Sequence, residues 1–143
     1  MLNTNIKAIY NKRSLQITID TPKMSFVKYK DDGSVDYISP FPCPFNYGSA
    51  PNTISGDGDR EDAIYLGKKI QKGHSVTVNV WGVVNFIDKG ENDPKYICSE
   101  EPPTLFNRAV IRGFFLLFAV MKRGFNRIKR KKGKTELLSI KYF

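Results

Sequence analysis

The stretch GDGDRED, residues 56–62, crowds aspartates into one turn of an otherwise basic chain. Asp57, Asp59 and Asp62 supply negative charge, and the two glycines allow backbone angles that other residues resist. Carboxylates this close repel one another, so the turn is suited to a positive partner. A surface turn that uses aspartate only for its turn-forming side chain is the alternative explanation of this stretch alone.

A second acidic loop, residues 88–95 with Asp88 and Asp93, follows about 25 residues later, after a stretch typical of β-strands. The intervening strand could bring the two loops together, and Lys28 and Lys95 are available for an anionic substrate. Carboxylate oxygens are hard ligands, and a cluster without histidine or cysteine neighbours suits Mg²⁺ or Mn²⁺ rather than zinc. The two loops together favour a metal site over a surface turn.

The elements that must position these loops are predicted to be mainly strands. Alternating or β-rich patterns predict strands at 15–19, 26–30, 35–38, 63–66, 75–86 and 96–98, with a final strand at 137–143. Residues 39–48, with three prolines in five positions, are predicted to form a rigid loop. The chain is expected to form one domain, residues 1–143, of the mainly β (α+β) class: a compact barrel closed by one long C-terminal helix.

The helix is predicted from a change of period after Thr104. Apolar residues then recur at steps of three and four, which is typical of one helical face, and Gly133 is expected to end the helix. The expected apolar face consists of Phe106, Val110, Phe114, Leu117, Met121, Phe125 and Ile128.

The net charge of +9 is concentrated in residues 122–134, the basic end of the predicted helix, which hold eight Lys or Arg and no acid. This stretch could contact nucleic acid or an anionic membrane surface. We favour the other interpretation, in which the helix packs on the barrel and its basic face is solvated. The longest apolar run, residues 113–121, is shorter than the roughly 20 residues that cross a bilayer. Cys43 and Cys98 lack zinc-ligand spacing, and a cytoplasmic protein with reduced thiols is expected.

The stretch from Pro44 to Asp62, PFNYGSAPNTISGDGDRED, resembles the signature of the soluble, metal-dependent inorganic pyrophosphatases of family I. That family carries a Pro-x-Asn-Tyr-Gly loop, then Asn/His-Thr-x-Ser, then Asp-Gly-Asp-x-x-Asp. Downstream, residues 82–84 and 88–95 resemble the family's Gly-Val-x segment and its Asp-x4-Asp-x-Lys loop. Upstream, residues 26–29 resemble a strand that bears a substrate-contacting lysine. The resemblance covers roughly residues 15–98.

The resemblance implies a five-stranded OB-like barrel with flanking helices, and the hydrolysis of inorganic pyrophosphate to two phosphates with Mg²⁺ or Mn²⁺ as cofactor. It also implies a homo-oligomer. By matched position it assigns three kinds of role to the site residues. Activating metals would be held by Asp57, Asp62 and Asp93, and a substrate-associated metal by Asp88. Asp59 would act as the general base. Phosphate oxygens would be contacted by Lys28, Tyr47 and Lys95.

Several positions depart from the family pattern, where acids, an arginine or tyrosines are expected: Thr18, Lys30, Tyr37, Cys43, Lys89 and Phe118. A late Tyr-Lys pair matches only Phe118-Ala119 or Met121-Lys122. Loss of one phosphate-binding cation commonly slows such a reaction by about a hundredfold or more. We hypothesise that Lys30 and Lys89 partly replace lost metal charge. The alternative function is a catalytically impaired relative that binds metal, phosphate or an anionic partner through its basic C-terminal region.

Overall fold

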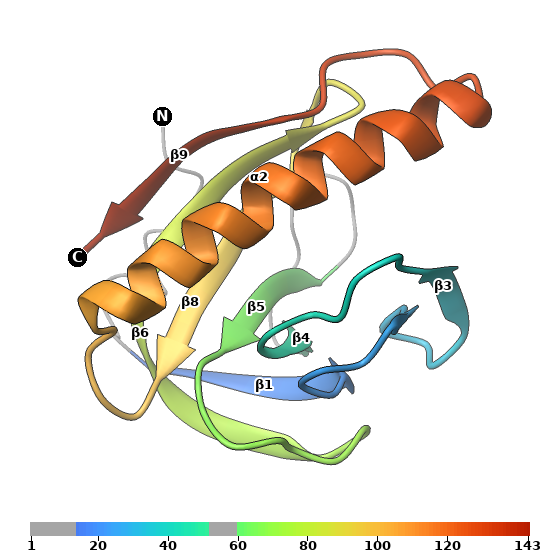
Figure 1. The fold of residues 1–143 in the computed structure, drawn as a ribbon. Helices are drawn as coiled ribbons and strands as arrows, with labels where there is room; N and C mark the ends of the chain where they lie inside the picture. The colour runs from blue at the N-terminus through green and yellow to red at the C-terminus, as the bar shows by residue number, and fades with distance from the viewer. Residues whose placement is uncertain (1–13, 52–59) are drawn as a thin grey trace.

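The computed structural model describes residues 14–51 and 60–143, so Asp57 and Asp59 lie outside the described residues. The described chain is mainly β with one long C-terminal helix, as predicted (Figure 1). In chain order the elements are β1 (Ser14–Thr21), β2 (Val27–Tyr29), β3 (Val35–Ile38), β4 (Asn46–Ala50), β5 (Glu61–Tyr65), β6 (Ser75–Asp88), β7 (Glu91–Asn92), β8 (Lys95–Ser99), α2 (Leu105–Ile128) and β9 (Glu136–Tyr142).

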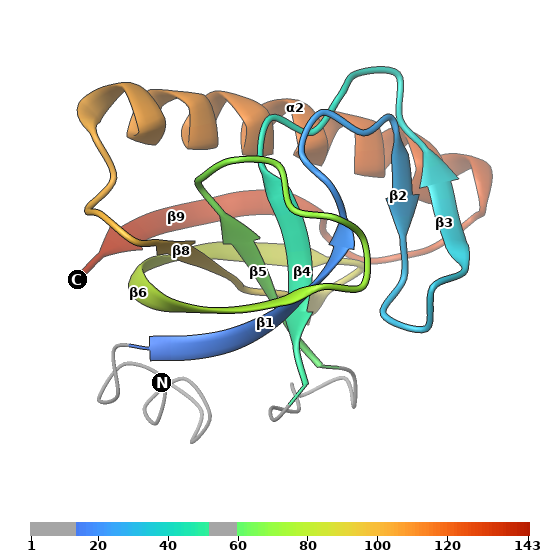
Figure 2. The same cartoon turned by 90° about the horizontal axis from the view of Figure 1, so that it is seen from below.

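Within the described residues, hydrogen-bonded strands form a cycle in the order β1-β4-β5-β8-β6, and β6 pairs back to β1. The 14-residue β6 makes this possible, because its first part pairs with β1 and its middle with β8. Figure 2 shows β6 curving around one end of the molecule, with the β2–β3 hairpin to one side. The cycle approximately fits the small barrel that was predicted. The parallel pairing of β5 with β8 places Asp62 directly beside Lys95.

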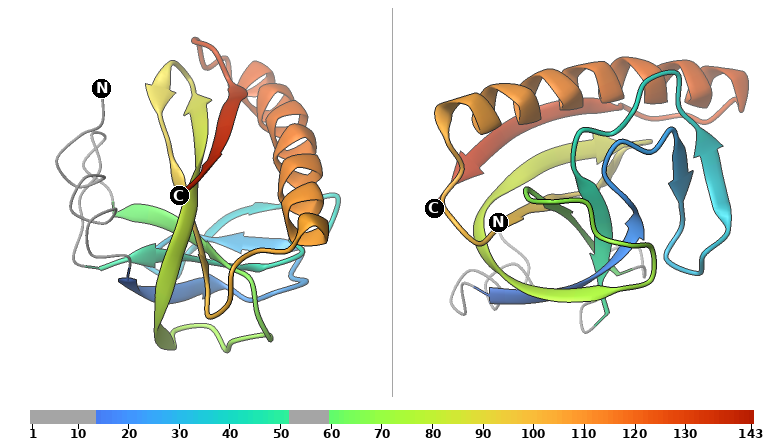
Figure 3. Two further views of the ribbon diagram at one scale, coloured as in Figure 1. Left: turned by 90° about the vertical axis from the view of Figure 1, so that its left-hand side faces the viewer. Right: turned by 60° about the horizontal axis from the view of Figure 1, so that its bottom comes forward.

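Two clusters of buried side chains stabilise this arrangement. One cluster fills the space enclosed by the strands and includes Ile17, Val80 and Tyr96. The other lies between the strands and α2, where Phe86 and Phe115 pack among further aromatic rings. Figure 3 shows α2 lying along one side of the strands, beside β9.

Helix α2 begins where the sequence predicts, because Thr104 is the N-cap and its hydroxyl accepts from the backbone N–H of Asn107 at 3.1 Å. The predicted apolar face is partly wrong. Phe106, Leu117 and Ile128 are exposed, because the helix packs through a face rotated toward Ile111, Phe115, Phe118 and Ala119. Among the described residues, no helix is long and apolar enough to span a bilayer.

The predicted helix end at Gly133 is also wrong, since α2 stops at Ile128. Arg130 adopts a left-handed φ of 56°, its N–H bonds to the Arg127 carbonyl, and the Lys131 N–H bonds to the Asn126 carbonyl. This is a Schellman-type ending, in which arginine occupies the position usually held by glycine. Gly133 instead permits close contact with the β6–β7 turn, since a Cβ there would lie 2.4 Å from the Lys89 carbonyl carbon.

The proline-rich loop ends earlier than predicted. Residues 39–48 were expected to be loop throughout, but β4 begins at Asn46, two residues after Pro44. Gly48 therefore lies within a strand, where a Cβ would approach the Thr18 carbonyl oxygen to 2.3 Å. This close approach of β4 to β1 explains why glycine occupies the position.

Candidate functional site

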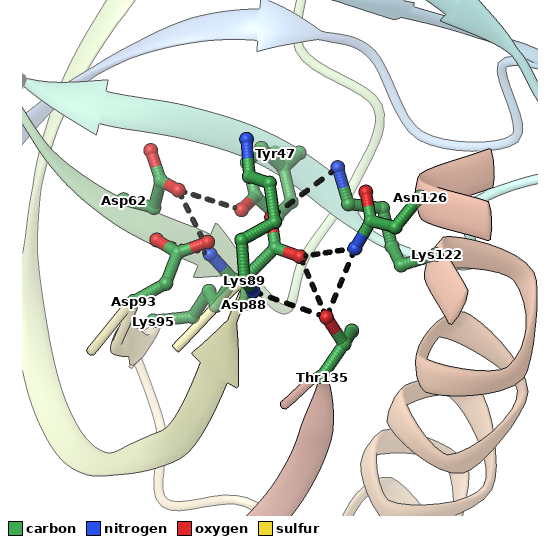
Figure 4. Close-up of polar contacts among 9 residues, drawn as sticks. All are labelled: Tyr47, Asp62, Asp88, Lys89, Asp93, Lys95, Lys122, Asn126 and Thr135. Carbon is green, nitrogen blue, oxygen red and sulfur yellow. Dashed lines mark hydrogen bonds and ion pairs between the residues drawn. The ribbon is translucent and has the colours of Figure 1, made fainter. Parts of the chain in front are cut away.

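The ammonium of Lys95 brings the two acidic stretches together (Figure 4). Lys95 lies at the start of β8 with a side chain only 1% exposed, and its Nζ is 2.9 Å from Asp62 Oδ2 and 2.8 Å from Asp93 Oδ1. The two carboxylates remain accessible, because the Asp62 and Asp93 side chains are 30% and 31% exposed. Two sequence-distant carboxylates therefore converge on one buried cation at the molecular surface.

Tyr47 and Lys28 border this pair of carboxylates. The Tyr47 hydroxyl donates to Asp62 Oδ2 at 2.9 Å. The Lys28 Nζ lies 4.2 Å from the centre of the Tyr47 ring, and the Lys95 Nζ lies 5.8 Å from it. Strands β2, β4, β5 and β8 thus each contribute one polar side chain to the same region.

The pKa directions follow from this packing. Burial alone would raise the pKa of Asp62, but Lys95 and Lys28 outweigh burial and lower it. Burial lowers the pKa of Lys28, while for Lys95 the two adjacent carboxylates overcome burial and raise the pKa. Burial also raises the pKa of Tyr47, which stays a neutral hydrogen-bond donor. The surroundings therefore favour the charged forms of Asp62 and Lys95, whereas burial raises the pKa of Asp93 and lowers that of Lys28.

Asp20 is a site residue that the sequence analysis missed. Thr18 was matched to an expected acid, but its hydroxyl lies 2.9 Å from the Ser75 hydroxyl. Asp20 is buried, and its carboxylate interacts electrostatically with Lys28 and Asp62. The register of β1 against β4 shifts between Ile19 and Thr21, so Asp20 sits at a bulge that redirects its side chain. The triplet Asp20-Thr21-Pro22 has the same acid-x-Pro pattern as the family's Glu-Ile-Pro and was the available signal.

Asp88 lies close to this group but its carboxylate is engaged with the C-terminal part of the chain (Figure 4). Asp88 Oδ1 accepts from Asn126 Nδ2 at 2.9 Å and from Thr135 Oγ1 at 3.1 Å. Asp88 Oδ2 lies 3.5 Å from Lys122 Nζ. Burial acts to raise the pKa of Asp88, but the Asn126 hydrogen bond, Lys122 and Thr135 together lower it.

The other departures from the family pattern occupy varied places. Lys30 is exposed, as is Lys89, which has a φ of 54° in the turn between β6 and β7. Tyr37 stacks edge-on against Phe125 of α2. The side chain of Cys43 is partly buried, and Phe118 belongs to the core beneath the helix.

The described part of the chain, which leaves out Asp57 and Asp59, contains no group of three His, Cys, Asp or Glu side chains that could hold a metal ion. Asp62 and Asp93 supply two convergent carboxylates. A third acidic ligand for the same ion would have to come from the remaining residues of the first stretch. The roles predicted for Asp57 and Asp59 stay predictions.

Comparison with known proteins points to one family. Residues 3–110 match the family described as inorganic pyrophosphatase. An inorganic pyrophosphatase of Malacoplasma penetrans is 34% identical over 91 residues, which are 58% of this chain and 50% of that protein. One from Helicobacter pylori is 34% identical over 100 residues, which are 64% of this chain and 58% of that protein.

Solved structures agree. The crystal structure of an inorganic pyrophosphatase from Neisseria gonorrhoeae matches with a TM-score of 0.73 and 25% identity, covering 92% of this chain and 84% of that one. The Thermus thermophilus inorganic pyrophosphatase has a TM-score of 0.76 over 91% of this chain and 83% of its own, and at 21% identity it supports the fold alone.

A barrel-like β unit with one long C-terminal helix and an acidic, lysine-bordered site defines the structural class of the described residues. Within that class, the chain belongs to the inorganic pyrophosphatase family. It spans about half the length of the relatives matched by sequence.

Proposed function

We propose that the chain hydrolyses inorganic pyrophosphate to two phosphates, with Mg²⁺ or Mn²⁺ as cofactor. The observation that carries the proposal is the convergence of Asp62 and Asp93 on Lys95, with both carboxylates partly exposed and Lys28 and Tyr47 beside them. The inorganic pyrophosphatase names of the relatives support the same activity.

The residues fit a divalent cation of the magnesium type. Asp62 and Asp93 present hard oxygen ligands without nearby soft ligands, and the two carboxylates outnumber the one ammonium in direct contact with them, that of Lys95. Such a cation, when bound, neutralises phosphate charge and lowers the pKa of water. Asp57 would add a further carboxylate to this set.

The chain's own side chains would bind and orient the substrate. Lys28 and Lys95 are ammonium groups fixed on strands, and they would contact phosphate oxygens together with the Tyr47 hydroxyl. Asp59 would accept the proton of the attacking water. Fixed cations oriented in this way stabilise the charge that develops on the leaving phosphate.

Asp88 does not fit the metal-ligand role in the arrangement described. Three groups from the C-terminal quarter of the chain already contact its carboxylate. The Asp88 carboxylate is therefore not assigned as a metal ligand.

The second candidate function is an impaired relative that binds metal or phosphate without efficient turnover. It is favoured by Tyr37, which stands where an arginine is expected and packs against the helix. Binding to nucleic acid or an anionic membrane through residues 122–134 remains the less favoured prediction, as Lys122 and Arg123 are used internally. A homo-oligomer and a cytoplasmic location also remain predictions.

A phosphate-release assay on the purified chain tests the proposal. We expect Mg²⁺-dependent release by the natural chain and a loss of about a hundredfold or more in Asp59→Asn. Glu101→Gln, an exposed change before the helix, is the matched control and should keep full activity. Binding of Mn²⁺ without phosphate release would support the impaired relative. Unchanged activity in Asp59→Asn would assign the base role to another group.

A further inference from the structure

The surroundings of Asp88 form a closed polar cluster. Asn126 Nδ2 donates to Asp88 Oδ1 and also to Thr135 Oγ1, both at 2.9 Å. The backbone N–H of Lys89 donates to Thr135 Oγ1 at 3.1 Å. Asn126 and Thr135 are themselves buried. One oxygen of the carboxylate is thus saturated by neutral donors, and the other faces the ammonium of Lys122.

Lys122 is held in position by the packing of its neighbours on α2. Met121 Sδ accepts from the Ser39 hydroxyl at 3.6 Å, and the Phe125 ring contacts the Tyr37 ring with centroids 5.3 Å apart. These contacts fix the helix turn that carries Lys122 against the segment around β3. The Lys122 side chain is only 18% exposed, and its Nζ lies 5.7 Å from the Tyr37 ring centre. A freely mobile surface lysine would not show these constraints.

We propose that Lys122 is a resident cation that replaces the substrate-associated divalent ion at Asp88. The expectation that a metal ion would otherwise bind at Asp88 rests on the proposed function. The ion pair between Lys122 and Asp88 does not depend on that function. The charges of Asp88 and Lys122 balance each other. A divalent ion would therefore have to displace the ammonium, and no excess negative charge of this pair would attract it. Lys122 also lies beside Tyr37, where the family resemblance expects an arginine, and therefore restores a positive charge to that region.

Counting bound Mn²⁺ tests this replacement without requiring turnover. The full chain is titrated with Mn²⁺ in the presence of saturating inorganic phosphate, and bound ions are counted by electron paramagnetic resonance. We expect Lys122→Gln to bind one more Mn²⁺ per chain than the natural protein. In the double variant Lys122→Gln/Asp88→Asn the additional ion should be lost, which would locate it at Asp88.

Lys129→Gln is the matched control, because it removes an exposed lysine from the end of the same helix and should leave the count unchanged. Circular dichroism checks that each variant is folded, and Lys122→Met serves as a second test of the same position. If the folded Lys122 variants bind no more Mn²⁺ than the natural chain, the proposal that Lys122 replaces an ion at Asp88 is wrong. If Lys122→Gln binds the additional ion but the natural chain releases no phosphate, the proposed function is wrong and the replacement of the ion by Lys122 still holds.

Discussion

Two lysine–aspartate clusters lie close together in the structure, and they differ in charge balance (Figure 4). The Lys95 cluster contains one ammonium and two carboxylates, from Asp62 and Asp93. The Lys122 cluster contains one ammonium and one carboxylate, from Asp88. Counted by direct ion pairs alone, carboxylates outnumber ammonium groups in the first cluster and are balanced in the second, while Lys28 acts on Asp62 and Lys89 on Asp88 from farther away.

The difference indicates where a divalent ion is attracted. An excess carboxylate favours a nearby cation, and partly buried charges are poorly screened by solvent. The Lys95 cluster has such an excess, with a lysine fixed on a central strand. The Lys122 cluster has none, and its carboxylate is further occupied by Asn126 and Thr135. On the proposed function, this difference makes the Lys95 cluster the better candidate for a metal ion.

The largest expected effect comes from removing the buried ammonium of the first cluster. Lys95→Met leaves Asp62 and Asp93 without their shared partner, and we expect the free energy of unfolding to fall by about 3–5 kcal/mol in the absence of metal. Urea denaturation at pH 7 measures this loss of stability. Lys134→Met is the control, because the ammonium of that 72%-exposed lysine pairs with Glu136 in solvent, and its loss should cost at most about 1 kcal/mol. Equal losses in the two variants would contradict the importance assigned to burial.

A smaller effect is expected when the neutral donor of the second cluster is removed. Asn126→Leu deletes the donor to Asp88 and Thr135 and should cost about 2 kcal/mol at pH 7. The folded pKa of Asp88 is lowered, so its carboxylate stabilises the fold above the unfolded pKa of about 3.9, and this stability is lost as pH falls through the folded pKa. The difference in the free energy of unfolding between the natural chain and the Asn126→Leu variant should therefore become smaller below about pH 4.

Urea denaturation at pH 7 and pH 3 checks this expectation. Asn85→Leu is the matched control, since Asn85 bonds to the Ser139 hydroxyl in an exposed position. We expect a loss below about 1 kcal/mol for it, with no dependence on pH. A difference for Asn126→Leu that grows toward low pH would refute the assigned interaction with Asp88.

The smallest effect, of opposite sign, is expected at Asp20. Burial raises the pKa of Asp20 to about 6, although Ser49 and Lys28 favour its charged form. Because the folded pKa is above the unfolded value of about 3.9, stability is lost as pH rises from about 4 to about 6. Asp20→Asn should therefore stabilise the fold by about 1 kcal/mol at pH 7 and by nothing near pH 4.

Thermal or urea unfolding across this pH range measures the gain at Asp20. Glu101→Gln, an exposed change before α2, is the control and should leave stability unchanged at both pH values. Destabilisation by Asp20→Asn at pH 7 would mean that the carboxylate stabilises the unliganded fold through Lys28.

Much of the fold could be predicted from local patterns. Alternation predicted β1 and β6, the three-and-four spacing predicted α2, and Thr104 marked its start. The motif order identified Lys95 and its two aspartate partners because each lies in a short stretch of distinctive composition. These features depend on neighbouring residues and are therefore visible in the sequence.

The missed features depend on contacts between distant segments or on a local irregularity. Asp20 sits at a bulge in β1, and the sequence analysis matched Thr18 instead to the acid that the family pattern expects. Arg130 ends the helix in a conformation for which glycine is the usual signal. The sequence offered Met121-Lys122 only as one of two matches to a late Tyr-Lys pair, and the contact of Lys122 with Asp88 became visible only with the position of α2. The sequence hypothesis named Lys30 and Lys89; both are exposed, Lys89 contributes to the lowered pKa of Asp88, and their role stays a prediction.

The sequence separation between Asp88 and its partners has a consequence for synthesis. Asn126 follows Asp88 by 38 residues and Thr135 by 47. A ribosome delivers the chain from its N-terminus, so the strands that hold Asp62 and Lys95 emerge before the donors that surround Asp88. On a nascent chain this carboxylate therefore stays hydrated until Thr135 has been synthesised and has left the ribosome.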